Sequence, residues 1–205
     1  MTDVTPAIFT SDVATLHSDV AKLAQTASWI QIDLSDGTMV PAQTVMDVET
    51  LKAIVSAHPG ISFEAHLMVD NPTKYVKPLS DAGFKRVIAQ VEASDPRLFL
   101  DEGQLESVEV GFALDGASEV EVIEPFLESI DLAVIMTIEA GVADGPFLPE
   151  CMEKIKSIRH HFPDLPIVAE GNIDERNAKL LTDAGVTRLV VSPRAFDAMQ
   201  STRVA

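Results

Sequence analysis

A regular alternation of short β-branched runs with longer stretches of helical period constrains the fold more than any other feature. The strand-like runs cover residues 4–9, 29–34, 62–69, 86–92, 107–114, 131–138, 166–171 and 188–192. Stretches with helical spacing follow them in turn, at residues 11–25, 42–57, 71–83, 95–103, 116–130, 147–161, 174–185 and 193–200. Strict alternation of this kind favours parallel strands joined by helical crossovers.

Eight strand–helix units in 205 residues are what a (β/α)8 barrel, or TIM barrel, requires. We therefore predict this fold as a single domain over residues 1–205. An open doubly wound sheet is the alternative, although no Gly-x-Gly-x-x-Gly motif follows any strand, which argues against its dinucleotide-binding form. Helix-end signals include Asp174 as an N-cap, Gly83 and Gly185 as C-terminal glycines, and Asp70 or Asn71 as a cap before a proline.

The charge of the chain limits its partners and its compartment. Fifteen Lys plus Arg against 32 Asp plus Glu give a net charge of -17, which opposes nucleic acid or an anionic membrane as a partner. No apolar run approaches the roughly 20 residues of a membrane span, and the acidic N-terminus lacks a signal-peptide pattern. A single cysteine, Cys151, rules out an internal disulfide. We expect a cytoplasmic protein.

Polar and ionisable residues recur where the predicted strands end, which is where such barrels carry their chemistry. Reading these ends in order gives Asp33, His66, Gln90, Glu92, Asp115, Met136, Glu139, Glu170 and Ser192. A buried ionisable group costs free energy unless it is paired or bound to a metal. The pattern therefore predicts that these residues converge at one polar mouth of the barrel. For Asp33 taken alone, the alternative is a carboxylate that caps a turn or a helix.

Four segments of the chain together resemble the ribulose-phosphate 3-epimerase family. They are WIQIDLSDGTMVP at 29–41, HLMVDNPTKYV at 66–76, VIMTIEAG at 134–141 and AEGNIDERNAKLLTDAGVTRLVVSPRAF at 169–196. These motifs occur in the family's order and spacing, and the similarity extends over nearly the whole chain. The resemblance implies a ribulose-phosphate-binding barrel and a proton-transfer epimerisation at C3 of a pentose phosphate.

The resemblance also implies a metal site. The family holds a divalent metal with two histidines and two aspartates, and the aspartates act as acid and base on opposite faces of C3. The matching positions here are Gln31, Asp33, His66 and Glu170, so Asp33 and Glu170 become the expected acid–base pair. An amide at Gln31 is a poor zinc ligand beside imidazole, although its oxygen suits a harder ion. We expect a weakened site for Zn, Mn, Mg or Fe.

The phosphate-binding positions implied by the resemblance are changed as well. Gly141 and Gly171 are retained, while Asp144 places an acid in the loop after strand six, Asn172 replaces a glycine, and Ser192 precedes a proline that offers no N–H. The expected substrate contacts are Gly141, Gly171, Asn172, Ser192, Arg194, Met68 and Met136. Arg194 would compensate for lost N–H groups as a cation.

Two function classes follow. One is a sugar-phosphate epimerase, impaired or altered in specificity. The other is a catalytically inactive barrel, a pseudoenzyme retained as a binding or scaffold protein. The expected partner is a small sugar phosphate. Because members of the family commonly form oligomers, the resemblance also implies a homo-oligomer. A decarboxylase or hexulose-phosphate synthase of the same barrel type would need a lysine at position 35, where this chain has Ser35. A Schiff-base aldolase would need a lysine at the C-terminal end of a strand, and none of the predicted strands ends in one. The sequence therefore disfavours both activities.

Overall fold

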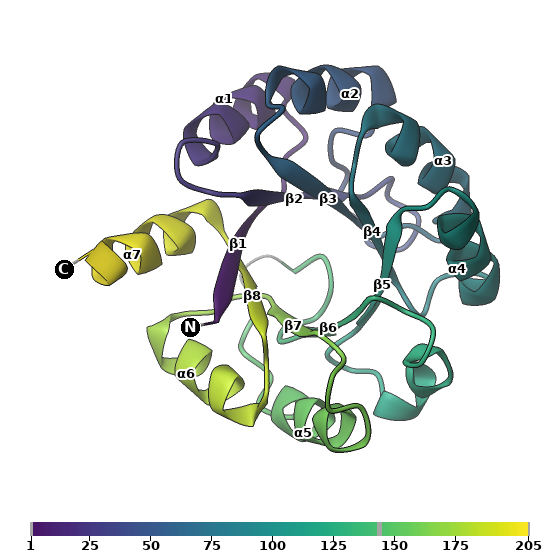
Figure 1. Ribbon diagram of the computed structural model, residues 1–205, viewed down its shortest axis with the longest axis vertical. Coiled ribbons are helices and arrows are strands. Elements are labelled where there is room, and N and C mark those ends of the chain that lie inside the picture. The colour runs from purple at the N-terminus through teal and green to yellow at the C-terminus, as the bar shows by residue number, and fades with distance from the viewer. Residues whose placement is uncertain (1, 143–144, 205) are drawn as a thin grey trace.

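Parallel strands close into a barrel in the computed structural model, which describes residues 2–142 and 145–204 (Figure 1). The strands are β1 (Asp3–Ile8), β2 (Trp29–Leu34), β3 (Ser62–Leu67), β4 (Arg86–Gln90), β5 (Glu109–Leu114), β6 (Leu132–Met136), β7 (Ile167–Glu170) and β8 (Arg188–Val191). Each strand pairs with the next, and β8 pairs with β1. The predicted (β/α)8 barrel is confirmed, and the open sheet was the wrong alternative.

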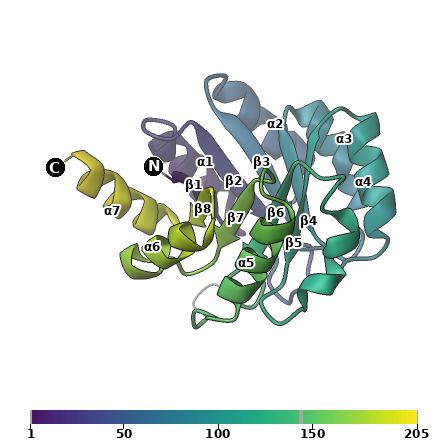
Figure 2. The same ribbon diagram turned by 60° about the horizontal axis from the view of Figure 1, so that its bottom comes forward.

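A ring of helices covers the outer face of the strands (Figures 1 and 2). They are α1 (Val13–Leu23), α2 (Val48–Ala57), α3 (Thr73–Ala82), α4 (Pro96–Leu105), α5 (Cys151–His161), α6 (Glu175–Ala184) and α7 (Pro193–Val204). Among the described residues, no helix is both long and apolar enough to cross a bilayer.

The helix expected at 116–130 does not form. The chain between β5 and β6 makes only two short 3-10 turns, η1 (Val120–Val122) and η2 (Glu124–Phe126). Pro125 has no N–H for an α-helical hydrogen bond, and the β-branched residues before it disfavour a helix. The prediction of an α-helix there was wrong.

The predicted helix ends are correct in three of four places. Asp174 accepts from the backbone of Asn177 and forms a capping box with it, and Gly83 and Gly185 end their helices with positive φ. The cap proposed for α3 was wrong, because Pro72 occupies the N-cap position and no described side chain caps that helix. Asp70 instead accepts a hydrogen bond from Ser94.

Two apolar layers hold the barrel together. The larger fills the space between strands and helices and includes the fully buried Phe63, Phe99 and Phe112. The smaller lies inside the barrel and includes Ile88 and Val134. Burying such a side chain stabilises the fold by about 1.5–3 kcal/mol. The buried polar and charged side chains of the strands lie on β1, β2, β3, β4 and β7.

An ion cluster lies at the N-terminal end of the barrel interior. Glu64 on β3 is fully buried and lies 2.6 Å from Nη1 of Arg86 and 2.7 Å from Nη1 of Arg188. A buried carboxylate of this kind is tolerated only when it is paired, so the two arginines satisfy Glu64 and close the end of the barrel away from the mouth.

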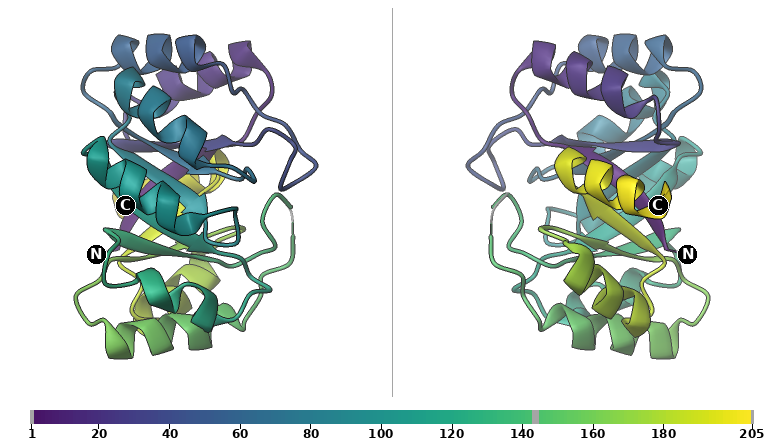
Figure 3. Two further views of the ribbon diagram at one scale, coloured as in Figure 1. Left: turned by 90° about the vertical axis from the view of Figure 1, so that its right-hand side faces the viewer. Right: turned by 90° about the vertical axis from the view of Figure 1, so that its left-hand side faces the viewer.

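Two loops approach each other beyond the C-terminal ends of the strands (Figure 3). In the loop after β2, Asp36 accepts from the backbone N–H of Thr38 at 3.1 Å and from the hydroxyl of Tyr75 at 3.1 Å. Val40 of this loop packs against Gly141 in the loop after β6, where a Cβ would lie only 2.7 Å from Cβ of Val40. Gly141 thus permits the close approach of the two loops.

Candidate functional site

Three ionisable side chains from three strands converge inside the mouth of the barrel. Asp33 lies one residue before the end of β2 and is in register with His66 of β3, and Glu170 ends β7. All three are buried, with 8% of Asp33, none of His66 and 6% of Glu170 exposed. Because alternate residues of a strand share one face, Gln31 points into the barrel together with Asp33. The predicted convergence of these four residues is present.

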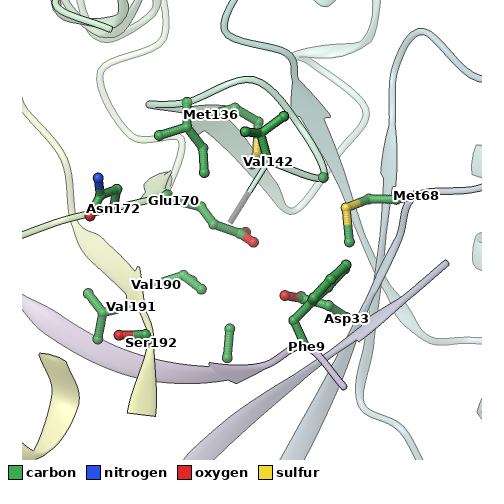
Figure 4. A pocket seen from close by; sticks show the side chains of 14 residues that line it. Phe9, Asp33, Met68, Met136, Val142, Glu170, Asn172, Val190, Val191 and Ser192 are labelled. Carbon is green, nitrogen blue, oxygen red and sulfur yellow. The ribbon is translucent and has the colours of Figure 1, made fainter. Parts of the chain in front are cut away.

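The ligand-type atoms of these residues are close enough to share one ion. His66 Nδ1 lies 3.0 Å from Glu170 Oε1 and 3.8 Å from Asp33 Oδ1. One such atom from each of Asp33, His66 and Glu170 lies within 4.8 Å of the others. The carboxylates of Asp33 and Glu170 both point into the pocket (Figure 4).

Gln31 joins the two carboxylates. Its amide nitrogen donates to Asp33 Oδ1 at 2.7 Å and to Glu170 Oε1 at 2.9 Å. Its amide oxygen, like Glu170 Oε2, is buried and has no hydrogen-bond partner among the described residues. In this orientation the residue holds the carboxylates together as a donor and turns its potential ligand atom away from them.

The site perturbs the proton affinity of its members. Burial raises the pKa of Asp33, and the neighbouring Glu170 carboxylate raises it further, to about 7. Burial lowers the pKa of His66, but the Glu170 and Asp33 carboxylates outweigh this effect and raise the pKa to about 9. A carboxyl that titrates near neutral pH is suited to take and return a proton.

Gln90, which ends β4, contacts the far side of His66. Its amide lies 3.0 Å from His66 Nε2, and both residues are almost completely buried. Gln90 was expected at the end of a strand, but no role in the site was predicted for it. Two inward-facing polar residues on adjacent strands were the available signal.

A cavity of about 130 Å³ opens above these groups. The expected contacts Met68, Met136, Gly141, Gly171, Asn172 and Ser192 all line it, together with Asp33 and Glu170. The cavity is also lined by apolar residues that were not predicted from the sequence, namely Phe9, Ile138, Val142, Val190 and Val191. Gln31 and His66 are fully buried and lie behind the lining, whereas Arg194 is exposed at the start of α7 and does not line the cavity.

The side of the cavity near β7 and β8 is formed by residues with unusual backbone conformations and by a proline. Gly171 has φ +113°, and a Cβ there would lie 2.5 Å from Cγ1 of Ile138. Asn172 also has positive φ, and its side-chain amide donates to the carbonyl of Gly145. Pro193 begins α7 without an N–H. Asp144, the acid expected to repel an anion here, lies outside the described residues.

Three of the four expected ligand residues are arranged so that they could hold a divalent metal. A carboxylate, an imidazole and a second carboxylate form a mixed oxygen and nitrogen set of the kind that zinc, manganese and iron accept. The unpaired Glu170 Oε2 supplies further ligand capacity. The fourth residue, Gln31, could contribute its oxygen only after its amide turned over.

Comparison with known proteins points to one family. A model of the ribulose-phosphate 3 epimerase family matches residues 3–196. Ribulose-phosphate 3-epimerase of Schizosaccharomyces pombe is 29% identical, covering 98% of this chain and 90% of the relative. That of Chlamydia pneumoniae is 31% identical, covering 95% and 88%.

Among solved structures, KGPDC from Streptococcus mutans superposes with a TM-score of 0.74 at 14% identity, covering 93% of this chain and 88% of that one. At that identity the likeness supports the barrel fold alone.

Proposed function

This chain belongs to the ribulose-phosphate 3-epimerase family, and we propose that it moves a proton at C3 of a pentose phosphate, using Asp33 and Glu170 as the acid–base pair. The observation that carries the proposal is the buried group of Asp33, His66 and Glu170 at the C-terminal ends of their strands. Family membership supports an epimerase-type reaction. The substrate and the roles of the individual residues are our proposal.

The two carboxyl groups have the properties that the reaction needs. Epimerisation next to a carbonyl requires a base that removes the C3 proton from one face and an acid that returns a proton to the other face. Asp33 and Glu170 reach the cavity from β2 and β7, so a sugar bound between them would present one face to each. With a pKa of about 7, Asp33 exchanges protons readily at neutral pH.

Asp33, His66 and Glu170 would hold a divalent metal, with Gln31 as a weak fourth ligand. When bound, such a metal supplies the positive charge that stabilises the negative oxygen at C2 after the C3 proton leaves. Because the Gln31 amide donates to both carboxylates, we propose that metal binds more weakly than it would to a site with histidine at this position.

We further propose that the protein is altered in specificity toward phosphorylated sugars. Within the described part of the chain, no lysine or arginine lines the cavity, and Asn172 already uses its amide to bind a carbonyl. A phosphate would depend on the N–H groups near Gly171 and Ser192. We therefore expect weak saturation by ribulose 5-phosphate.

The orientation of Gln31 favours a second candidate, a barrel that binds a sugar phosphate without turning it over. In that reading the Gln31 amide binds one oxygen of Asp33 and the His66 imidazole binds one oxygen of Glu170, without a metal. Conversion of ribulose 5-phosphate to its C3 epimer, followed by NMR with and without added Mn²⁺ or Zn²⁺, separates the two. Metal-dependent conversion that is lost in Asp33→Asn supports the enzyme, whereas ligand binding with no conversion under any metal supports the binding protein.

A further inference from the structure

We propose that Gln90 is a positioning residue, whose side-chain amide fixes the imidazole of His66 so that Nδ1 faces Asp33 and Glu170 and Nε2 carries a hydrogen. Gln90 does not reach the cavity and acts only through His66. The orientation of His66 in the protein itself is independent of the proposed function. Only the consequence for metal binding rests on that function.

The backbone of β5 determines how the amide of Gln90 must lie. With its nitrogen toward β5, Gln90 donates to the carbonyl of Ala113 at 3.1 Å and to Glu92 Oε2 at 3.2 Å. In the opposite orientation its oxygen would face these acceptors without a hydrogen bond. A carbonyl cannot donate, so the nitrogen of Gln90 is committed to this side.

Glu92 is held in place in turn, because its Oε1 accepts from the backbone N–H of Asp115 at 2.9 Å. The acceptor that Gln90 faces is therefore anchored to the chain that follows β5. The direction of every hydrogen bond in this series is set by a backbone group at its far end.

The hydrogen on His66 Nε2 follows from that direction. The oxygen of Gln90 faces His66 Nε2 at 3.0 Å, and an amide oxygen can only accept, so Nε2 carries a hydrogen. Nδ1 lies 3.0 Å from Glu170 Oε1, a carboxylate oxygen that also accepts, so in the metal-free protein Nδ1 carries a hydrogen as well. Turning the ring over would put carbon atoms in place of both nitrogens and break both contacts. Partners of this type commonly orient metal-binding histidines.

The first test needs no metal. In the metal-stripped, ¹⁵N-labelled protein near neutral pH, His66 should give an Nε2–H signal that is protected from solvent exchange and shows a cross-peak to the Gln90 side chain. Gln90→Met keeps nearly the same volume but replaces the amide oxygen with a thioether sulfur, which is only a weak acceptor, and the lost hydrogen bond should speed that exchange by about tenfold or more. Gln104→Met, on the exposed face of α4, is the matched control and should leave the signal unchanged.

A second variant covers the case in which Gln90→Met does not fold. Gln90→Asn keeps the amide but shortens its reach by one methylene, so it should also release the ring. An unprotonated Nε2 in the wild-type protein, or an equally protected signal in whichever variant folds, would overturn the proposal.

The second test uses ¹¹³Cd²⁺ as the probe. In the wild-type protein we expect ¹¹³Cd coupling to Nδ1 of His66, and in the folded Gln90 variant a cadmium dissociation constant about 10-fold to 100-fold larger. Coupling to Nε2 would overturn the proposal. A wild-type protein that binds no cadmium would count against the proposed metal site alone, since the metal-free measurement still decides the role of Gln90.

Discussion

Replacing Gln31 with histidine should strengthen zinc binding by about 100-fold or more. In the structure, the amide of Gln31 donates to Asp33 Oδ1 at 2.7 Å and to Glu170 Oε1 at 2.9 Å, so its oxygen can reach a metal only after both bonds break. Hydrogen bonds to charged groups contribute about 1.5–3 kcal/mol each, which puts the cost of turning the amide at about 3–6 kcal/mol. Even the lower value corresponds to about two factors of ten in affinity, at about 1.4 kcal/mol per factor.

Histidine avoids that cost, because its ring nitrogen is a ligand without rearrangement of an amide. The assay is competition of the protein with a chelator for Zn²⁺, after the purified protein has been stripped with EDTA and its native metal content measured. We expect wild-type protein to purify with little or no zinc, and Gln31→His to retain it.

Gln31→Leu is the matched control, because it removes the two hydrogen bonds without adding a ligand. It should gain much less zinc affinity than Gln31→His. Stoichiometric zinc in the wild-type protein, or an affinity of Gln31→His no better than that of Gln31→Leu, would refute the reasoning.

Three further predictions test the site and its surroundings. The pKa of His66 is raised from 6.5 to about 9 in the fold, so the native state binds this proton more tightly and the metal-free protein should lose stability as pH rises through that window; urea unfolding in EDTA should show the fall, and His66→Gln should lack it. Asp36→Asn should lower the unfolding free energy by about 1 kcal/mol through its turn and α3 contacts while leaving proton exchange on substrate intact, as thermal unfolding and NMR would report. Gly171→Ala puts a Cβ 2.5 Å from Ile138 at positive φ, so it should destabilise the protein by about 1–3 kcal/mol and raise KM more than it lowers kcat; an unchanged melting temperature would contradict it.

The alternation of strand and helix patterns was sufficient to predict the barrel, because strand period and helix period are local properties of the chain. It failed at 116–130, where apolar spacing alone indicated a helix and Pro125 allowed only short turns. The convergence of Asp33, His66 and Glu170 was also predictable, since each lies at or next to the C-terminal end of a strand and parallel strands end on one side.

The hydrogen-bond directions within the site were not predictable from the sequence. Gln31 binds Asp33 two residues away but also Glu170, which is far along the chain, and only the closed barrel brings them together. The same holds for Gln90, whose orientation depends on the backbone of Ala113. Such contacts depend on strand register, which hydrophobic patterns do not encode at the level of single atoms.

Deuterium incorporation at C3 tests the central claim, that Asp33 and Glu170 transfer a proton at this mouth, more directly than any other measurement. Ribulose 5-phosphate would be incubated in D₂O with metal-loaded protein and followed by NMR, using wild type, Asp33→Asn and the control Asp36→Asn. We predict slow, metal-dependent exchange in wild type and Asp36→Asn, and none above background in Asp33→Asn. Exchange that survives Asp33→Asn, or its complete absence from metal-loaded wild type at saturating substrate, would contradict the account.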